Sequence, residues 1–219
     1  MDYIKLIIDS INEMSGRYSS YEIFSDWIKC GSLMMSNQTD LFHNRIWQQR
    51  EQDYIETMKK YSAGEQQKIA DLLGMLVLAM DQEITDVLGT VYMRAELGSK
   101  STGQFFTPFH LSRLTAEAAI PKNVGLESPL IMNEPSTGGG GMIIAVARVL
   151  KDRGINPQQC MDVTAQDLDW KGVYMTYLQL SILGIKATVV QGDTLVEPYQ
   201  KGYSPERVLY TPARKGLIL

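Results

Sequence analysis

A run of four glycines, residues 138–141, constrains the fold of this chain more than any other feature. It follows the apolar run PLIMN (129–133), which predicts a buried strand, and precedes MIIAVARVL (142–150), which predicts an apolar helix. Four glycines leave no side chain at the carboxyl end of the strand, where open α/β sheets bind their ligands. We interpret the run as a ligand-binding loop, because a tight turn without a ligand would lose considerable chain entropy for no gain.

The region around this loop alternates between strand-type and helix-type segments. Short β-branched or apolar runs predict strands, and the longer segments between them predict helices. The predicted strands are 129–133, 160–166, 186–193 and 207–212, and the predicted helices are 107–119, 142–150 and 169–183. Pro108 is expected as the first helical residue of 107–119. This order predicts a parallel sheet with helices on its faces.

The first 98 residues predict a different architecture. They contain no proline and carry apolar residues at helical spacing. We expect helices over 3–11, after Ser19 and Ser20, and over 41–61, 66–80 and 83–97. The following GSKSTG (98–103) is a linker or an ordered loop. The predicted organisation is therefore a helical module, residues 1–98, packed on an α/β domain, residues 99–219, or on a second copy of itself.

Composition narrows the class of protein. The 219 residues carry a formal net charge of −4, which gives no general attraction to nucleic-acid phosphates. Two cysteines and two histidines are too few for a disulfide framework or a His- or Cys-based metal site, so we predict no metal. The amino terminus lacks a signal-peptide pattern, and no apolar run reaches about 18 residues. These features predict a soluble, cytoplasmic protein without a membrane segment.

Three acidic residues follow the first three predicted strands. Glu134 precedes the glycines, where it would repel a pyrophosphate and suit an ammonium group. Asp167 follows the second strand and can accept both hydroxyls of a ribose, and Asp193 follows the third. The loop matches neither the Walker A motif nor G-x-G-x-x-G. Each acid alone would be a solvated loop residue, but together they predict a nucleoside ligand.

Four motifs, in this order, resemble a known family. They are GQFFTP (103–108), EP-x-x-G-x-GG (134–141), QD (166–167) and GDTL (192–195). The set is similar to that of adenine-N6 DNA methyltransferases of the type I restriction–modification modification-subunit kind, and to small phage- and mobile-element-borne N6 DNA methylase-like proteins. The resemblance covers roughly residues 60–212. It implies a truncated Rossmann-like methyltransferase core that uses S-adenosylmethionine (SAM).

The resemblance also implies a role for each residue of a SAM site. The methionine end of the cofactor would lie against Phe106, Thr107 and Pro108. The amino-acid moiety would be held by Glu134, Pro135, Ser136, Gly138 and Gly140. Asp167 would accept the ribose hydroxyls, and Asp193, with Thr194 beside it, would approach the adenine ring; Leu168 is also predicted to bind the cofactor.

The predicted catalytic stretch departs from the family pattern. The family has Asn/Asp-Pro-Pro-aromatic after its fourth strand, where the polar residue binds the target amine and the ring stacks on a flipped adenine. Here the stretch reads Thr211-Pro212-Ala213-Arg214, so Thr211, Pro212 and Arg214 would form a degenerate catalytic motif. Threonine cannot position an amine as an amide does, and we expect methyl transfer by the isolated chain to be absent or very slow.

Two functions of different classes are consistent with these features. The first is SAM-dependent methylation of adenine N6 in DNA. The alternative is a non-catalytic SAM-binding regulator, anti-restriction factor or subunit of a larger methyltransferase complex; a small-molecule or protein methyltransferase is a third. Because the family usually continues beyond the last residue here, we expect a minimal SAM-binding protein or a partner that completes the sheet beside its last strand.

The predicted partners are DNA, bound directly or only with a partner chain, and a second copy or a recognition subunit. Residues 199–219 carry Lys201, Arg207, Arg214 and Lys215 against Glu206. This basic stretch is either a nucleic-acid contact or an ordinary carboxyl terminus.

Overall fold

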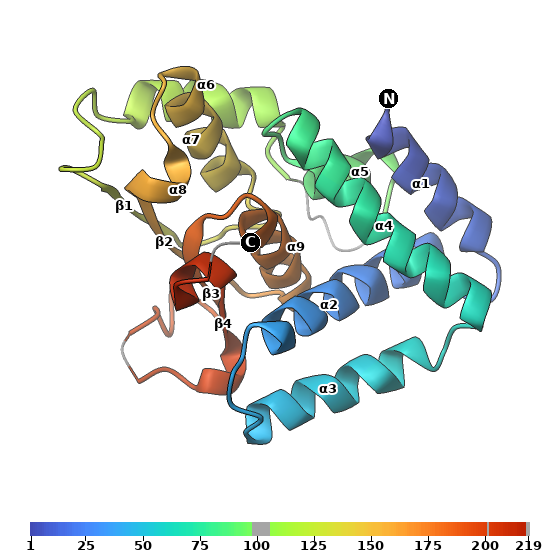
Figure 1. The fold of residues 1–219 in the computed structure, drawn as a ribbon. Coiled ribbons are helices and arrows are strands. Elements are labelled where there is room, and N and C mark those ends of the chain that lie inside the picture. Colours follow the sequence, from blue (N-terminus) through green and yellow to red (C-terminus); the bar gives the residue numbers. More distant parts are fainter. Residues whose placement is uncertain (98–105, 201, 218–219) are drawn as a thin grey trace.

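The computed structural model describes residues 1–97, 106–200 and 202–217. Figure 1 shows a group of long helices at the amino-terminal end beside a small sheet with its own helices. GSKSTG, the first three residues of GQFFTP and the predicted boundary at residue 98 lie outside the described residues. No helix in the described ranges has the length and hydropathy needed to cross a membrane.

Five helices form the amino-terminal part: α1 (Tyr3–Met14), α2 (Ser20–Gln38), α3 (Arg45–Met58), α4 (Ala63–Gln82) and α5 (Val87–Arg94). Capping boxes begin α2 and α4, because Ser19 and Ser62 exchange hydrogen bonds with Glu22 and Glu65. The helix predicted over 41–61 begins later than expected, since the Asn44 side chain caps residues 46 and 47. The helix predicted over 83–97 is shorter than expected, because Asp86 is the N-cap and α5 begins only at Val87.

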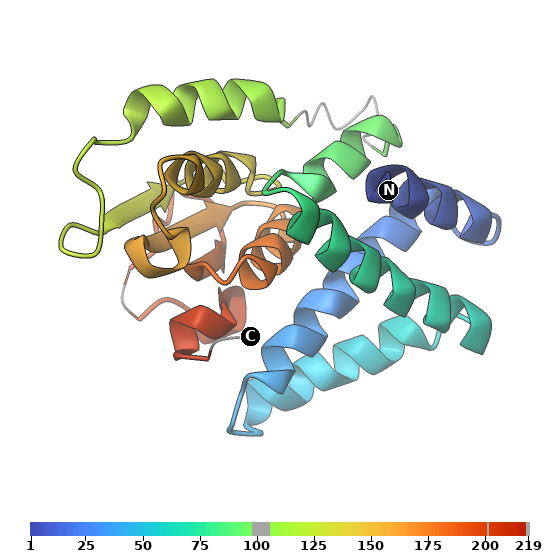
Figure 2. The same cartoon turned by 45° about the horizontal axis from the view of Figure 1, so that its top comes forward.

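The apolar faces of these helices form one core. Its fully buried members include Ile7, Ile11, Phe24, Trp27, Leu72 and Leu76. Met175 and Leu178 from helix α9 (Trp170–Ile182) belong to the same core. The helical part therefore packs on α9, as the second view also shows (Figure 2).

The described strands form a sheet in the order β1-β2-β3-β4: β1 (Leu130–Glu134), β2 (Met161–Asp167), β3 (Lys186–Gln191) and β4 (Val208–Tyr210). β1, β2 and β3 are parallel, but β4 is antiparallel to β3. The prediction of a parallel sheet is therefore wrong for the fourth strand. A parallel neighbour requires a crossover, usually helical, whereas the described residues between β3 and β4 form loops and one short 3-10 helix, η1 (Pro205–Arg207).

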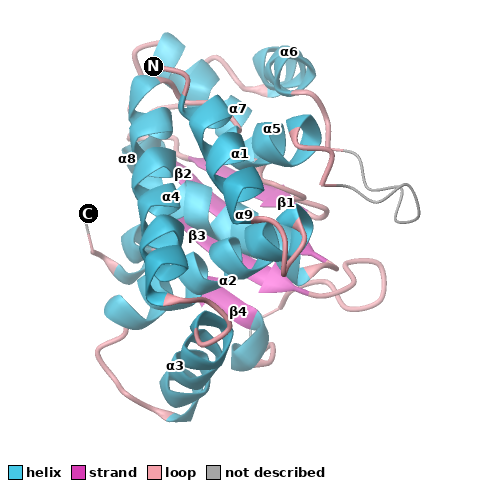
Figure 3. Ribbon diagram, turned by 90° about the vertical axis from the view of Figure 1, so that its right-hand side faces the viewer, coloured by secondary structure: helices cyan, strands magenta, loops and turns pink. Residues whose placement is uncertain are grey.

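Helices α7 (Gly141–Asp152) and α9 cover one face of this sheet, with α6 (Phe109–Ala119) packed on α7 and α8 (Pro157–Cys160) leading into β2 (Figure 3). Val163 of β2 shares a core with Ile143 of α7 and Val173 of α9. The connections β1-α7-β2 and β2-α9-β3 each join two parallel strands, and both advance across the sheet in the same direction. Because such crossovers are right-handed, both helices lie on the same face.

The edge strand β1 is only partly buried. Ile131, in the middle of this strand, is 84% exposed, while Leu130 and Met132 pack on the core. The prediction of a buried strand over 129–133 is therefore wrong for alternate residues. The cause is packing on one face only, because successive side chains of a strand point to opposite faces. Among the described residues, Leu130 and Met132 face the core shared with α7 and α9, and Ile131 points to the other face.

Candidate functional site

A cleft of about 320 Å³ lies at the carboxyl ends of β1 and β2. Six of the predicted cofactor residues line it, namely Phe106, Thr107, Glu134, Ser136, Gly138 and Asp167. Its remaining lining residues are Asp86, Ser112, Thr137, Gly139, Gly141 and Met142. A larger cleft of about 540 Å³ lies among α4, α8 and the carboxyl-terminal ends of α7 and α9, and none of the predicted site residues lines it.

The glycine loop of this cleft is held in one conformation by buried hydrogen bonds. The Thr176 hydroxyl donates to the Gly138 carbonyl (3.0 Å), and the Gln179 amide donates to the Gly139 carbonyl (2.8 Å). Gly138 has φ +54°, and a Cβ added there would lie 2.9 Å from the Phe106 ring. Only glycine both adopts this left-handed backbone conformation readily and leaves room for the Phe106 ring at this position.

Asp167 is fixed by the same loop. Its Oδ2 accepts a hydrogen bond from the Gly138 N–H (2.7 Å), and its Oδ1 accepts one from the Asp169 N–H (2.9 Å). Each carboxylate oxygen has a further lone pair available, so the side chain can still accept bonds from two ligand hydroxyls.

Glu134 supplies a second carboxylate, at the last residue of β1. Burial raises the pKa of this carboxyl; the Ser136 N–H, 3.4 Å away, lowers the pKa, and the nearby Asp167 charge raises it further. A cationic group in the cleft would favour the ionised form.

Phe106 connects the cleft to the helical part. Its ring lies 5.0 Å from that of Tyr92 in α5. The Tyr92 hydroxyl accepts a hydrogen bond from the buried Lys171 ammonium (3.0 Å), whose nitrogen lies 4.6 Å from the centre of the same ring. These contacts fix the side of the cleft formed by Phe106 and Thr107.

The other predicted cofactor residues do not line the cleft. Gly140 (φ +89°) is the N-cap of α7, and Pro108 is the N-cap of α6 rather than its first helical residue, because its ψ of 133° is extended. The Thr194 hydroxyl donates to the Pro135 carbonyl (2.6 Å), which keeps the loop after β3 beside the cleft. Asp193 accepts a bond from the Leu195 N–H, and Leu168 is 66% exposed.

The predicted catalytic residues lie at the other end of the strands, near the start of β3 and away from the cleft. Thr211 is fully buried; its hydroxyl donates to the Ile185 carbonyl (2.8 Å) and accepts from the Ala187 N–H (2.9 Å). Ala187 precedes the carboxyl end of β3 by four residues, about 13 Å of strand. The structure therefore places Thr211 away from the cleft, because β4 runs antiparallel to β3.

Pro212 and Arg214 follow Thr211 away from the cleft. Pro212 begins the 3-10 helix η2 (Pro212–Lys215) and is buried. The Arg214 guanidinium pairs with Asp162 near the start of β2, at 2.5 Å. Neither side chain is placed to contact a ligand at the carboxyl edge, so the structure also separates these two predicted catalytic residues from the cleft.

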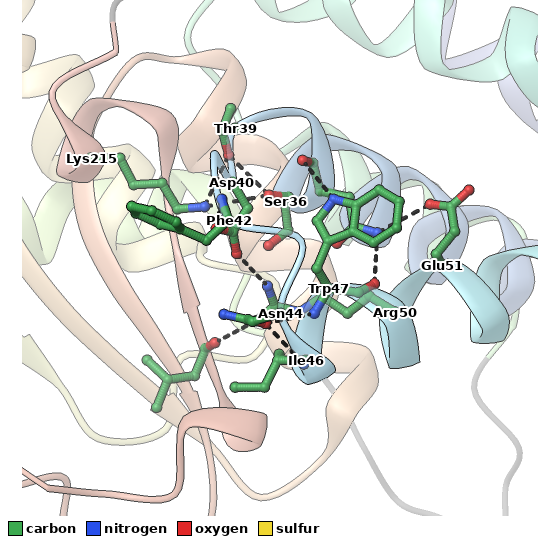
Figure 4. Close-up of polar contacts among 12 residues, drawn as sticks. Ser36, Thr39, Asp40, Phe42, Asn44, Ile46, Trp47, Arg50, Glu51 and Lys215 are labelled. Atoms are coloured by element: carbon green, nitrogen blue, oxygen red, sulfur yellow. Dashed lines mark hydrogen bonds and ion pairs between the residues drawn. The ribbon is translucent and has the colours of Figure 1, made fainter.

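The described basic side chains of the carboxyl-terminal stretch contact the protein itself. Figure 4 shows Lys215, whose ammonium donates to the Ser36 carbonyl (3.3 Å) and the Thr39 hydroxyl (3.2 Å) at the end of α2. The nearby Arg50 guanidinium donates to the Val208 carbonyl (3.1 Å), and Arg207 pairs with Glu197 (2.8 Å). These contacts favour an anchored carboxyl terminus over a nucleic-acid contact; Lys201 lies outside the described residues.

Sequence reasoning missed Asp86, which lines the cleft from the helical part. It is the N-cap of α5, and its carboxylate accepts hydrogen bonds from the Gly89 N–H (2.8 Å) and the Gln179 amide (2.9 Å). An aspartate just before an apolar helix is an N-cap signal, but the proximity of Asp86 to the glycine loop is visible only in the fold.

The comparisons with known proteins agree with this geometry. A solved structure described as a candidate class I S-adenosylmethionine-dependent methyltransferase from Listeria monocytogenes shares the fold, with a TM-score of 0.52 and 12% identity over 89% of this chain and 54% of that one. A type I restriction–modification methyltransferase subunit from Streptococcus thermophilus matches with a TM-score of 0.49 and 16% identity, over 88% of this chain and 43% of that one. No curated protein matches the sequence.

The fold shared with the Listeria structure confirms the predicted Rossmann-like core behind a helical amino-terminal part. The chain spans about half the length of these two solved structures. The model of one family, N-6 DNA methylase, matches residues 84–211, which is more than half of the sequence. This range includes the described cleft residues, from Asp86 to Asp167. The chain therefore belongs to the N-6 DNA methylase family.

Proposed function

We propose that this protein binds SAM in the cleft at the carboxyl edge and acts as the SAM-binding unit of an adenine-N6 DNA methyltransferase. One observation carries the proposal: the described lining of the cleft combines a fixed glycine loop with three carboxylates and contains no Lys, Arg or His. SAM has an ammonium group, a sulfonium centre and two ribose hydroxyls, which complement this lining, whereas a pyrophosphate would be repelled.

Each part of the lining has a proposed task. Glu134 and the backbone of the glycine loop would hold the amino-acid moiety, and Asp167 would accept the ribose hydroxyls. Because residues 138–141 carry no side chains, the cofactor can approach the backbone of the loop closely. When bound, SAM supplies an electrophilic methyl group.

One observation favours the subunit form of this function over an independent enzyme. Thr211, the residue predicted to accept the target amine, uses its hydroxyl within the sheet at the far edge. We therefore propose that DNA is methylated only in a complex whose partner positions the adenine.

Calorimetric titration with SAM, followed by a tritium-transfer assay on mixed DNA, tests both parts of the proposal. Absence of SAM binding would contradict the proposal, and transfer by the purified chain alone would contradict its second part.

Changing Asp167 to Ala should weaken SAM binding by about 1.5–3 kcal/mol, because the variant loses hydrogen bonds to a charged acceptor. Isothermal titration calorimetry gives the dissociation constants. Asp71→Ala is the matched control, since Asp71 is exposed on α4 and does not line the cleft. Equal affinities for Asp167→Ala and the unchanged protein would remove Asp167 from the site.

The affinity for SAM should rise with pH because of Glu134. Its pKa is raised above the ordinary value of 4.5, so the carboxyl is still partly protonated at a pH where an exposed glutamate is ionised. A cationic ligand prefers the ionised form, and binding should therefore weaken as the pH falls through this raised pKa. Titrations at several pH values should show a flatter profile for Glu134→Gln. An unchanged profile in that variant would exclude Glu134 as the responsible group.

A further inference from the structure

The Asp86 carboxylate lies against the glycine loop, where a side chain at Gly89 or Gly141 would crowd it. A Cβ added at Gly141 would meet its Oδ2 at 3.0 Å, one at Gly139 would lie 3.5 Å from its Oδ1, and one at Gly89 would clash with Oδ2. The residue is 4% exposed. The loop and the first turn of α5 are thus built around this carboxylate.

Only one of its two oxygens is used within the described part of the chain. The Gly89 N–H and the Gln179 amide both donate to Oδ1, and no described donor reaches Oδ2. Burial raises the pKa of the Asp86 carboxyl, against the lowering effect of these two hydrogen bonds. A buried carboxylate with one oxygen still available needs a cationic or hydrogen-bonding partner to stay ionised.

The position of Asp86 in the cleft indicates which group of a bound ligand would contact its Oδ2. Glu134 and Asp167 come from the ends of β1 and β2, whereas Asp86 enters from α5, beneath residues 139–141 and on the side formed by Phe106 and Thr107. This is the side proposed above for the amino-acid end of the cofactor. A primary ammonium group has three donors and can be shared between two carboxylates.

We propose that Asp86 is a third acidic group of the cofactor site and that its Oδ2 accepts a hydrogen bond from the ammonium group of the amino-acid end of SAM. This inference rests on the proposed function. If Asp86 binds the ammonium group, the helical part contacts the ligand directly, in addition to packing on α9. The competing explanation is purely structural, since an anion at this place also stabilises the first turns of α5 and α7.

Calorimetry with two ligands separates the explanations. SAM carries the ammonium group, whereas 5′-methylthioadenosine has the same nucleoside but a neutral thioether and no amino-acid end. S-adenosylhomocysteine, a neutral thioether that keeps the ammonium group, is titrated as a check and should lose affinity as SAM does. For Asp86→Asn we expect the affinity for SAM to fall about tenfold or more, while that for 5′-methylthioadenosine stays within twofold of the unchanged protein. Asp2→Asn is the control, because Asp2 caps α1 in the same way and lies outside the cleft lining.

Several results would overturn the inference. An unchanged affinity for SAM, or an equal loss for both ligands, would leave Asp86 with a structural role only. If Asp86→Asn fails to fold by circular dichroism, Asp86→Ser replaces it, since serine also caps helices but has no carboxylate. Binding of SAM to the unchanged protein shows separately whether the proposed function holds, so failure of that function is not confused with failure of this assignment.

Discussion

Replacing Gly138 with valine is expected to reduce SAM affinity by at least about 100-fold, or about 2.7 kcal/mol. Two independent effects act together. Gly138 has φ +54°, a left-handed conformation that costs a residue with a Cβ about 1–2 kcal/mol. The new side chain would also start 2.9 Å from the Phe106 ring, in the cleft itself. Because Phe106 packs on Tyr92, moving the ring away disturbs the wall of the cleft.

The matched control is Gly154→Val. Gly154 has φ +77° and therefore the same backbone strain, but an added Cβ has no neighbour within 4 Å. Both variants should lose folding stability, while only Gly138→Val should lose SAM binding in calorimetric titration. Normal binding by Gly138→Val would place the ligand elsewhere, and equal loss in both variants would point to a general effect on the fold.

The features that could be predicted from sequence depend on residues close together in the chain. The glycine run lies between a strand and a helix as expected, and Glu134 and Asp167 meet at one edge because β1 and β2 are parallel neighbours. Capping signals such as Ser62 with Glu65 define helix starts within three residues. Of the twelve cofactor residues that the family resemblance implies, six line the cleft.

The errors depend on contacts between distant residues. The direction of β4 is set by the loop after Asp193, whose path has no periodic pattern to read. The reversal moves Thr211 from the expected edge to the opposite one. Asp86 was missed because its contact with Gly141 joins residues 55 positions apart (141 − 86), and a single N-cap aspartate carries no sign of it.

Changing Thr211 to valine is expected to destabilise the fold by roughly 2–5 kcal/mol and to leave SAM affinity unchanged. Valine has the same shape but cannot make the bonds to the Ile185 carbonyl and from the Ala187 N–H. Each buried group left without a partner costs about 1–3 kcal/mol. Since whole domains are stable by about 5–15 kcal/mol, the change is readily measured by urea unfolding.

Thr188→Val gives a closely matched comparison. Thr188 lies on β3, is 1% exposed, and its buried hydroxyl has no hydrogen-bond partner in the described structure. Replacing this hydroxyl should be neutral or stabilising, because no bond is lost and an unsatisfied polar atom is removed. If Thr211→Val instead kept its stability and lost SAM binding, Thr211 would belong to the binding site, and the antiparallel pairing of β4 with β3 would have to be wrong. A loss of stability specific to Thr211→Val, with intact binding, would mean that the residue matching the family's catalytic position serves here to hold the sheet together.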